Sequence, residues 1–217
     1  MFKQEGALVR YGTKLGNLMI LQILVVLTSI PIITIGPAMT AMHSVLLDIY
    51  RDEETGITKS YFQAFKCNFK QAVVIWLLYL LAFAFLIFDF FVLMNAENVY
   101  LQLTAQILPL PLIVLLITLL WVFPLQSRYE NTIWNTIKNA FLMSIHKIVP
   151  TVAMAIINLV PVAVLVFLPS LMPVVLLLGS TIPGIVCAGM YSKVYDGLEG
   201  YSRFKKQEED TEEAEEV

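Results

Sequence analysis

Hydrophobic residues form long continuous runs in this chain, and short polar clusters separate the runs. Five runs are close to 20 residues long, namely residues 15–35, 72–94, 103–124, 149–168 and 171–191. A helix of about 20 residues rises far enough to cross the ~30 Å hydrocarbon core of a bilayer. Because the runs are continuous rather than alternating, they predict transmembrane helices and not the strands of a barrel.

A shorter apolar stretch, residues 38–50, follows Gly36-Pro37 and ends at the charged cluster that begins with Arg51. As a helix it would cover only ~20 Å, which is less than the hydrocarbon core. Glycine and proline suit a tight turn followed by a new helix. Two arrangements follow: a second crossing whose outer turn, at Gly36-Pro37, lies below the membrane surface and packs on neighbouring spans, or a re-entrant segment that leaves the N-terminus outside.

The positive charges distinguish these arrangements. All 14 lysines and arginines fall in four clusters, which are Lys3, Arg10 and Lys14; Arg51, Lys59, Lys66 and Lys70; Arg128, Lys138 and Lys147; and Lys193, Arg203, Lys205 and Lys206. The connections near Gly36, Asn95 and Ser170 contain none. Since positively charged loops stay in the cytoplasm, we expect both termini there and two crossings within residues 15–50. The predicted fold is an all-α membrane bundle of about six transmembrane helices, with three outer turns.

Composition agrees with this class. The chain is 58% hydrophobic and 14% charged, against about 25% charged residues in a typical soluble domain. Residues 1–206 are expected to form one membrane domain, and the acidic residues 207–217 a disordered cytoplasmic tail. Cys67 and Cys187 fall in a predicted cytoplasmic loop and a predicted span, so they are expected to be free thiols.

Motifs of catalysis are missing from the sequence. It contains no phosphate-binding loop, no paired-histidine metal motif and no nucleophile elbow, and only two histidines. We therefore expect neither an enzyme nor a bound cofactor or metal, and no nucleic-acid partner.

Two predicted cytoplasmic segments, residues 58–70 and 130–147, are amphipathic. Such helices lie at the membrane interface with lysines near anionic headgroups. Each is either an elbow that positions the next span or a docking surface for a partner, and the two roles are compatible. The candidate docking residues are Phe62, Phe65, Lys66, Phe69, Trp134 and Ile137.

The last predicted span has small residues at four-residue intervals: Ser180, Gly184, Ala188 and Ser192. Small residues at this spacing let another helix approach closely inside lipid. The ridge serves either packing within the chain or contact with a partner's helix. In the second case, a leucine at Gly184 would release the partner while the protein still inserts.

Polar residues within spans are few, and such residues are usually functional because burying charge in hydrocarbon is costly. The candidates are His43, Asp89 and Asn158. His43 and Asp89 would form a proton or ion relay if the fold paired them. The alternative is a packed histidine and an aspartate solvated at the interface.

Most of the chain resembles the YesL-like family, a family of small bacterial membrane proteins of unknown function, and the resemblance is densest over the first third, residues 17–72. The resemblance rests on Asn17-Leu18, on PIITIGPAMTA at residues 31–41, on the phenylalanine and lysine pattern of residues 62–70, and on VFPLQSRYENT at residues 122–132. Such proteins are often encoded beside carbohydrate ABC importers in Gram-positive bacteria. The resemblance therefore implies a bacterial cytoplasmic-membrane protein and an auxiliary subunit that supports such an importer. The alternative is a small independent solute transporter.

Overall fold

The computed structural model describes residues 2–53 and 56–197, with side chains from residue 12 onward. Within these residues the structure contains helices and no strand. The helices are α1 Phe2–Thr28, η1 Ile32–Thr34, α2 Ile35–Arg51, α3 Ile57–Met94, α4 Val99–Ala105, α5 Pro109–Arg128, α6 Ile133–His146, α7 Ile148–Phe167, η2 Pro169–Leu171, α8 Met172–Leu178 and a last helix, Thr181–Gly197. The predicted acidic tail lies outside the described residues.

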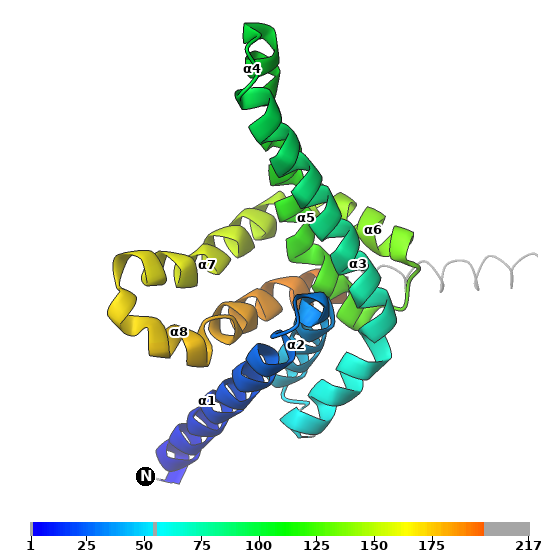
Figure 1. Cartoon of the computed structure of the whole chain (residues 1–217). Coiled ribbons are helices and arrows are strands. Elements are labelled where there is room, and N and C mark those ends of the chain that lie inside the picture. Colours follow the sequence, from blue (N-terminus) through cyan, green and yellow to red (C-terminus); the bar gives the residue numbers. More distant parts are fainter. Residues whose placement is uncertain (1, 54–55, 198–217) are drawn as a thin grey trace, which may run out of the picture.

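Helix α2 forms the centre of the molecule (Figure 1). Ten of its 17 residues are buried, and its most extensive contact is with α3, followed by α5. The small residues of its first turns allow this close packing, because Gly36, Ala38 and Thr40 leave little side-chain volume between the helices. The core therefore gathers around the short second helix rather than around the long apolar ones.

Two apolar arms extend from this centre in different directions (Figure 1). One contains the second half of α3 together with α4 and the start of α5, and the other contains α7, η2 and α8. Large side chains such as Phe85, Phe88 and Phe167 are exposed on them. Only 6% of the most apolar stretch of α3 and 11% of that of α7 are buried within the chain. Such surfaces are stable in hydrocarbon and not in water.

Within residues 2–53 and 56–197, four helical segments are long and apolar enough to cross a membrane, and a bent pair makes a fifth if it forms one span. The described apolar part of α1, Gly12–Thr28, is shorter. The chain is thus an all-α helical membrane bundle with several spans, as the sequence predicts.

Three details differ from the sequence prediction. The turn between the first two helices lies at Ser29 to Pro31 and not at Gly36-Pro37, which forms the buried first turn of α2, where a proline is expected. Residues 58–70 do not form a separate helix, because α3 runs without a break from Ile57 to Met94 and contains no glycine or proline that would end it.

The last predicted span is the third difference. It breaks at Gly179 and Ser180, where the two halves meet at 51°. Pro183 lacks the N–H that would bond to the carbonyl of Gly179, so the sequence itself weakens the helix there.

The first turn packs on the side of α3. A Cβ atom on Gly36 would lie 2.5 Å from the Ala72 carbonyl oxygen, and the Trp76 ring N–H donates to the Ile32 carbonyl at 2.7 Å. Beyond Trp76, α3 continues for the 18 residues to Met94, which is about 27 Å of helix. The turn between α1 and α2 therefore lies well short of the end of the α3–α4 arm.

Polar contacts join the predicted cytoplasmic segments at one end of the molecule. Lys14 pairs with Asp52 at 2.6 Å, and Arg51 pairs with Asp196 at 2.6 Å. The neighbouring Tyr195 ring contacts that of Tyr129 after α5, with centroids 5.4 Å apart.

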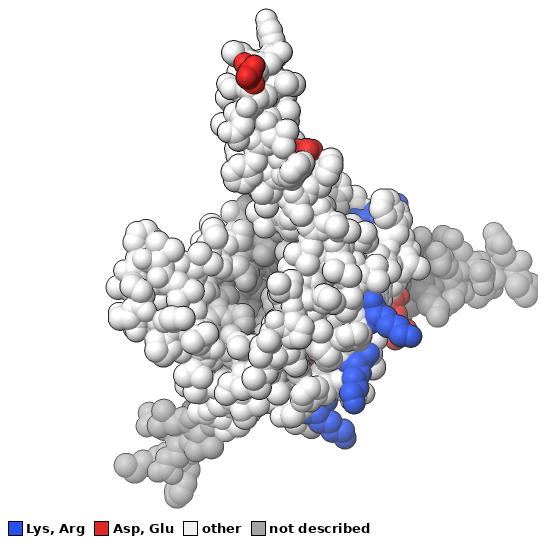
Figure 2. Space-filling view, in the orientation of Figure 1, with Lys and Arg blue, Asp and Glu red and all other residues white. Residues whose placement is uncertain are grey.

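A further hydrogen bond joins α3 to the loop between α5 and α6, because the Gln71 side-chain amide donates to the Asn131 carbonyl at 2.6 Å. On the face seen in Figure 2, most of the basic side chains lie at the end of the molecule away from the α3–α4 arm. The charged side chains on the arm itself are acidic in this view. Segments that the charge pattern assigns to one side of the membrane are thus close together.

Gln22 of α1 stabilises the break before the last helix. Its side-chain oxygen accepts from the N–H groups of Ser180 and Thr181, both at 3.1 Å, and from the Ser180 hydroxyl at 2.7 Å. The first N–H groups of a helix have no partner within the helix. Gln22, which is 158 residues earlier in the sequence than Ser180, supplies the missing partner at the start of the last helix.

Replacing Gln22 with methionine should lower stability by about 1–3 kcal/mol, because it keeps the volume and removes the acceptor from buried donors. The thermal unfolding midpoint in detergent measures this loss. Ile23→Met, at the exposed neighbouring position, serves as the control and should unfold near the wild-type temperature. Equal midpoints for the two variants would contradict the role given to Gln22.

Candidate functional site

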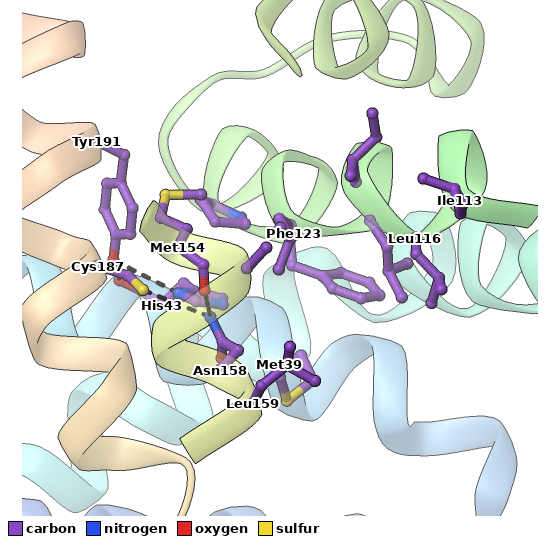
Figure 3. A pocket seen from close by; sticks show the side chains of 15 residues that line it. Met39, His43, Ile113, Leu116, Phe123, Met154, Asn158, Leu159, Cys187 and Tyr191 are labelled. Atoms are coloured by element: carbon purple, nitrogen blue, oxygen red, sulfur yellow. Dashed lines mark hydrogen bonds between the residues drawn. The ribbon is translucent and has the colours of Figure 1, made fainter. Parts of the chain in front are cut away.

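Two of the three polar candidates line the same pocket. His43 of α2 and Asn158 of α7 both face a cavity of about 380 Å³ between α2, α5, α7 and the last helix. Figure 3 shows them at one end of it, beside Cys187 and Tyr191, with Ile113 and Leu116 at the other end. The fold thus brings together residues that are 115 positions apart in the sequence.

Hydrogen bonds hold this polar end in place. The Tyr191 hydroxyl donates to the His43 carbonyl at 3.3 Å and lies 3.5 Å from Nδ1 of the same histidine. The Asn158 amide donates to the Met154 carbonyl at 2.8 Å and to the Cys187 sulfur at 3.5 Å. Sequence reasoning missed Tyr191 and Cys187, because a tyrosine and a cysteine in an apolar run resemble ordinary packing residues.

Asp89 lies elsewhere. It is partly exposed on the α3 arm and does not line the pocket, so the structure does not form the His43–Asp89 pair that a relay would need. Within the described residues, no group of three or more histidine, cysteine or acidic side chains is placed to hold a metal ion.

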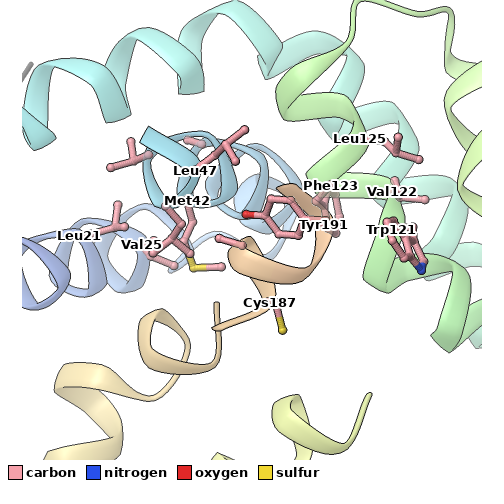
Figure 4. Packing of buried hydrophobic residues seen from close by; sticks show 14 of the residues in the cluster. Leu21, Val25, Met42, Leu47, Trp121, Val122, Phe123, Leu125, Cys187 and Tyr191 are labelled. Carbon is pink, nitrogen blue, oxygen red and sulfur yellow. The ribbon is translucent and has the colours of Figure 1, made fainter. Parts of the chain in front are cut away.

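The small-residue ridge of the last helix packs inside the chain. A Cβ atom on Gly184 would lie 2.5 Å from Cδ1 of Leu46 in α2, and Ala188 and Ser192 are buried. Ser180 bonds to Gln22, as described above. Figure 4 shows the same helix contributing Cys187 and Tyr191 to the cluster that contains Met42 of α2.

The ridge was predicted either to pack within the chain or to contact a partner's helix, and in the structure it packs within the chain. A leucine at Gly184 would therefore disturb the protein's own core rather than act on a partner alone. The close approach is between the last helix and α2. In lipid the hydrophobic effect does not hold helices together, and small residues allow the close packing that does.

The first part of α3 has an exposed aromatic and basic face. Phe62 and Phe69 are exposed, and Lys66 lies between them. Phe65 is partly buried and stacks on Tyr61 with ring centroids 6.1 Å apart, and its ring contacts that of Phe69 at 5.5 Å. Phe65 therefore anchors the face, whereas Phe62, Lys66 and Phe69 remain available for contact.

Helix α6 lies against α5 and also contacts α3. Its buried side is formed by Thr136, Ala140 and Ser144, with Ile137 partly buried against the core. Trp134 is 74% exposed. Four of the residues predicted for docking are thus exposed, namely Phe62, Lys66, Phe69 and Trp134, and we call this predicted set the docking face. The first three lie on α3 and Trp134 on α6, and the Gln71–Asn131 bond links α3 to the loop that precedes α6.

The fold and these features define a multi-pass helical membrane protein with a pocket between α2, α5, α7 and the last helix. The sequence profile of a family described as "Protein of unknown function, DUF624" matches residues 18–90. The matched segment contains the second part of α1 from Leu18, all of α2 and most of α3, including the aromatic part of the docking face. No curated protein and no solved structure matches the chain.

Proposed function

We propose that this protein is an auxiliary membrane subunit that associates with a carbohydrate ABC importer in the bacterial cytoplasmic membrane. The link to sugar uptake comes from the resemblance to the YesL-like family. The family match over residues 18–90 supports that resemblance and carries no function of its own, because the matched family is described as a protein of unknown function. We propose no catalytic step for this chain.

One observation is the main support for an auxiliary role. Within the chain, only 6% of the most apolar stretch of α3 and 11% of that of α7 are buried. Helices in lipid associate through close packing, and most of these two surfaces remains open to the helices of another membrane protein. The docking face lies on the same α3 helix, at its basic end.

The pocket does not suit a sugar. Eleven of its 15 lining residues are apolar, whereas a site for a carbohydrate must replace the many hydrogen bonds that its hydroxyl groups make to water. Transport of a sugar by this chain alone is therefore the weaker proposal.

A small independent transporter is still the alternative, because His43 and Asn158 share the pocket. Uptake of a solute by proteoliposomes that contain only this protein, and its loss in His43→Ala, would favour transport over the auxiliary role.

Affinity purification in mild detergent, followed by mass spectrometry, tests the auxiliary role. The tagged protein should bring down a permease and an ATPase subunit of one importer when the cells grow on the corresponding sugar. A tagged, unrelated multi-pass protein at the same expression level is the control. Recovery of the protein without any importer subunit would overturn the proposal.

The proposal includes an orientation with both termini in the cytoplasm, which follows from the positive charges. Introduced cysteines can test this orientation in a Cys67→Ser background. Tyr100→Cys, at the exposed start of α4, should react with an impermeant thiol reagent added outside intact cells. Lys59→Cys should react only after permeabilisation. Ile30→Cys should not react from outside, because the turn beside it packs near Trp76 and lies about 27 Å short of the end of α3. Outside labelling at position 59 would reverse the orientation.

A further inference from the structure

The interior pocket has the size and lining of a small-molecule site. Its volume of about 380 Å³ lies within the range of ~300–1,000 Å³ for ligand pockets, which combine apolar walls with a few polar groups. Among the described residues no aspartate, glutamate, lysine or arginine lines it. The absence of a countercharge excludes a charged head group, since a buried charge without a partner is strongly unfavourable.

The mouth of the pocket is formed by membrane-spanning helices. Ile113 and Leu116 of α5 and Leu159 of α7 line the pocket and are also exposed on the surface. The deeper wall contains the buried Met154, Cys187 and Tyr191. A ligand would therefore enter from the hydrocarbon of the bilayer, with an apolar body along the α5 wall.

The polar end has unused hydrogen-bonding capacity. Asn158 donates both of its hydrogen bonds from the side-chain amide N–H₂, and within the described residues its side-chain carbonyl oxygen has no partner. Because the Tyr191 hydroxyl donates to the His43 carbonyl, its oxygen is free to accept from Nδ1–H of His43, which lies 3.5 Å away. That tautomer leaves Nε2 of His43 as a second acceptor.

The Asn158 carbonyl oxygen and Nε2 of His43 are thus two hydrogen-bond acceptors at the end of an uncharged apolar pocket. Such a site suits a ligand with an uncharged donor group. We infer that this pocket binds a single-chain amphiphile with a hydroxyl head group, taken from the bilayer, with the hydroxyl at Asn158 and His43 and the chain along Ile113 and Leu116. This ligand site does not depend on the auxiliary role, so either can fail without the other.

Photoaffinity labelling in nanodiscs tests the site. The probe is a long-chain alcohol with a diazirine in its chain, and the control probe is the matching alkane without the hydroxyl. The alcohol should label peptides that contain Leu116 or Leu159 about tenfold more than the alkane does, which is the factor expected from one net hydrogen bond of ~1.4 kcal/mol. Equal labelling by both probes, or alcohol labelling spread evenly along both arms, would overturn the inference.

Two variants with one matched control complete the test. Ala155→Trp fills the pocket and should abolish labelling by the alcohol. Ile156→Trp adds the same ring at an exposed neighbouring position outside the pocket and should label like wild type. Asn158→Leu keeps the volume and removes one of the two acceptors, so it should lower labelling by the alcohol towards the alkane level. Full labelling of a folded Ala155→Trp or Asn158→Leu variant would also overturn the inference.

Discussion

Gly36→Ala should be among the most destabilising single substitutions in this protein. A Cβ atom at this position would lie 2.5 Å from the Ala72 carbonyl oxygen and 2.7 Å from the Trp76 Cβ atom. Both are backbone or near-backbone atoms of α3, so no flexible side chain can move aside, and the two helices must separate. Overpacking of this kind typically costs about 1–3 kcal/mol, and we expect a value at the upper end.

The thermal unfolding midpoint in detergent measures this effect, and Gly16→Ala is the matched control. Nothing lies within 4 Å of a Cβ atom added at Gly16, and alanine favours a helix over glycine by roughly 1 kcal/mol. The control should therefore unfold at or above the wild-type temperature. A Gly36→Ala midpoint equal to that of wild type would show that α2 and α3 do not approach as closely as the structure has them.

Replacing Phe62 and Phe69 together with serine should release the proposed importer partner. Both side chains are exposed, so their loss removes little of the protein's own core. Aromatic anchors at the centre of an interface each contribute about 2 kcal/mol or more. Recovery of permease and ATPase subunits in the affinity purification should therefore fall by roughly tenfold or more.

Gln63→Ala is the control for this double variant, because Gln63 is exposed on the same turn of α3 and is not part of the docking face. It should recover the importer subunits like wild type. Undiminished recovery with the folded double variant would place the docking surface elsewhere.

The class of the protein could be predicted from the sequence because it depends on quantities that the sequence contains directly. The lengths of the apolar runs and the absence of alternation require spanning helices. The exact breaks depend on packing between distant segments. Gly36-Pro37 looks like a turn, yet it lies inside α2, because Ala72 and Trp76 of α3 accept a helix with no side chain at position 36.

The small-residue ridge illustrates the same limit. Its spacing predicts a helix contact, and the structure has one between Gly184 and Leu46, but spacing alone does not tell an internal neighbour from a partner. The broken last span has a similar cause. Gly179 and Pro183 weaken that helix locally, and Gln22, far away in the sequence, stabilises the break.

The pocket was partly visible in the sequence. His43 and Asn158 stood out because polar side chains are rare in apolar runs. His43 and Asn158 come together because α2 and α7 pack beside the last helix. That helix also brings Tyr191 and Cys187 to the polar end of the pocket. Asp89 was chosen by the same rule, but it lies on an arm that the pocket does not reach.

Photocrosslinking in living cells tests the auxiliary role most directly, because it keeps the native membrane intact. A photoreactive amino acid replaces Trp134 on the docking face, which is 74% exposed, and the crosslinked products are identified by mass spectrometry. The proposed role predicts a crosslink to a subunit of a carbohydrate ABC importer, and its loss in the Phe62→Ser, Phe69→Ser background. Crosslinks from position 134 only to lipid or to other copies of this chain, in cells that express the importer, would contradict it.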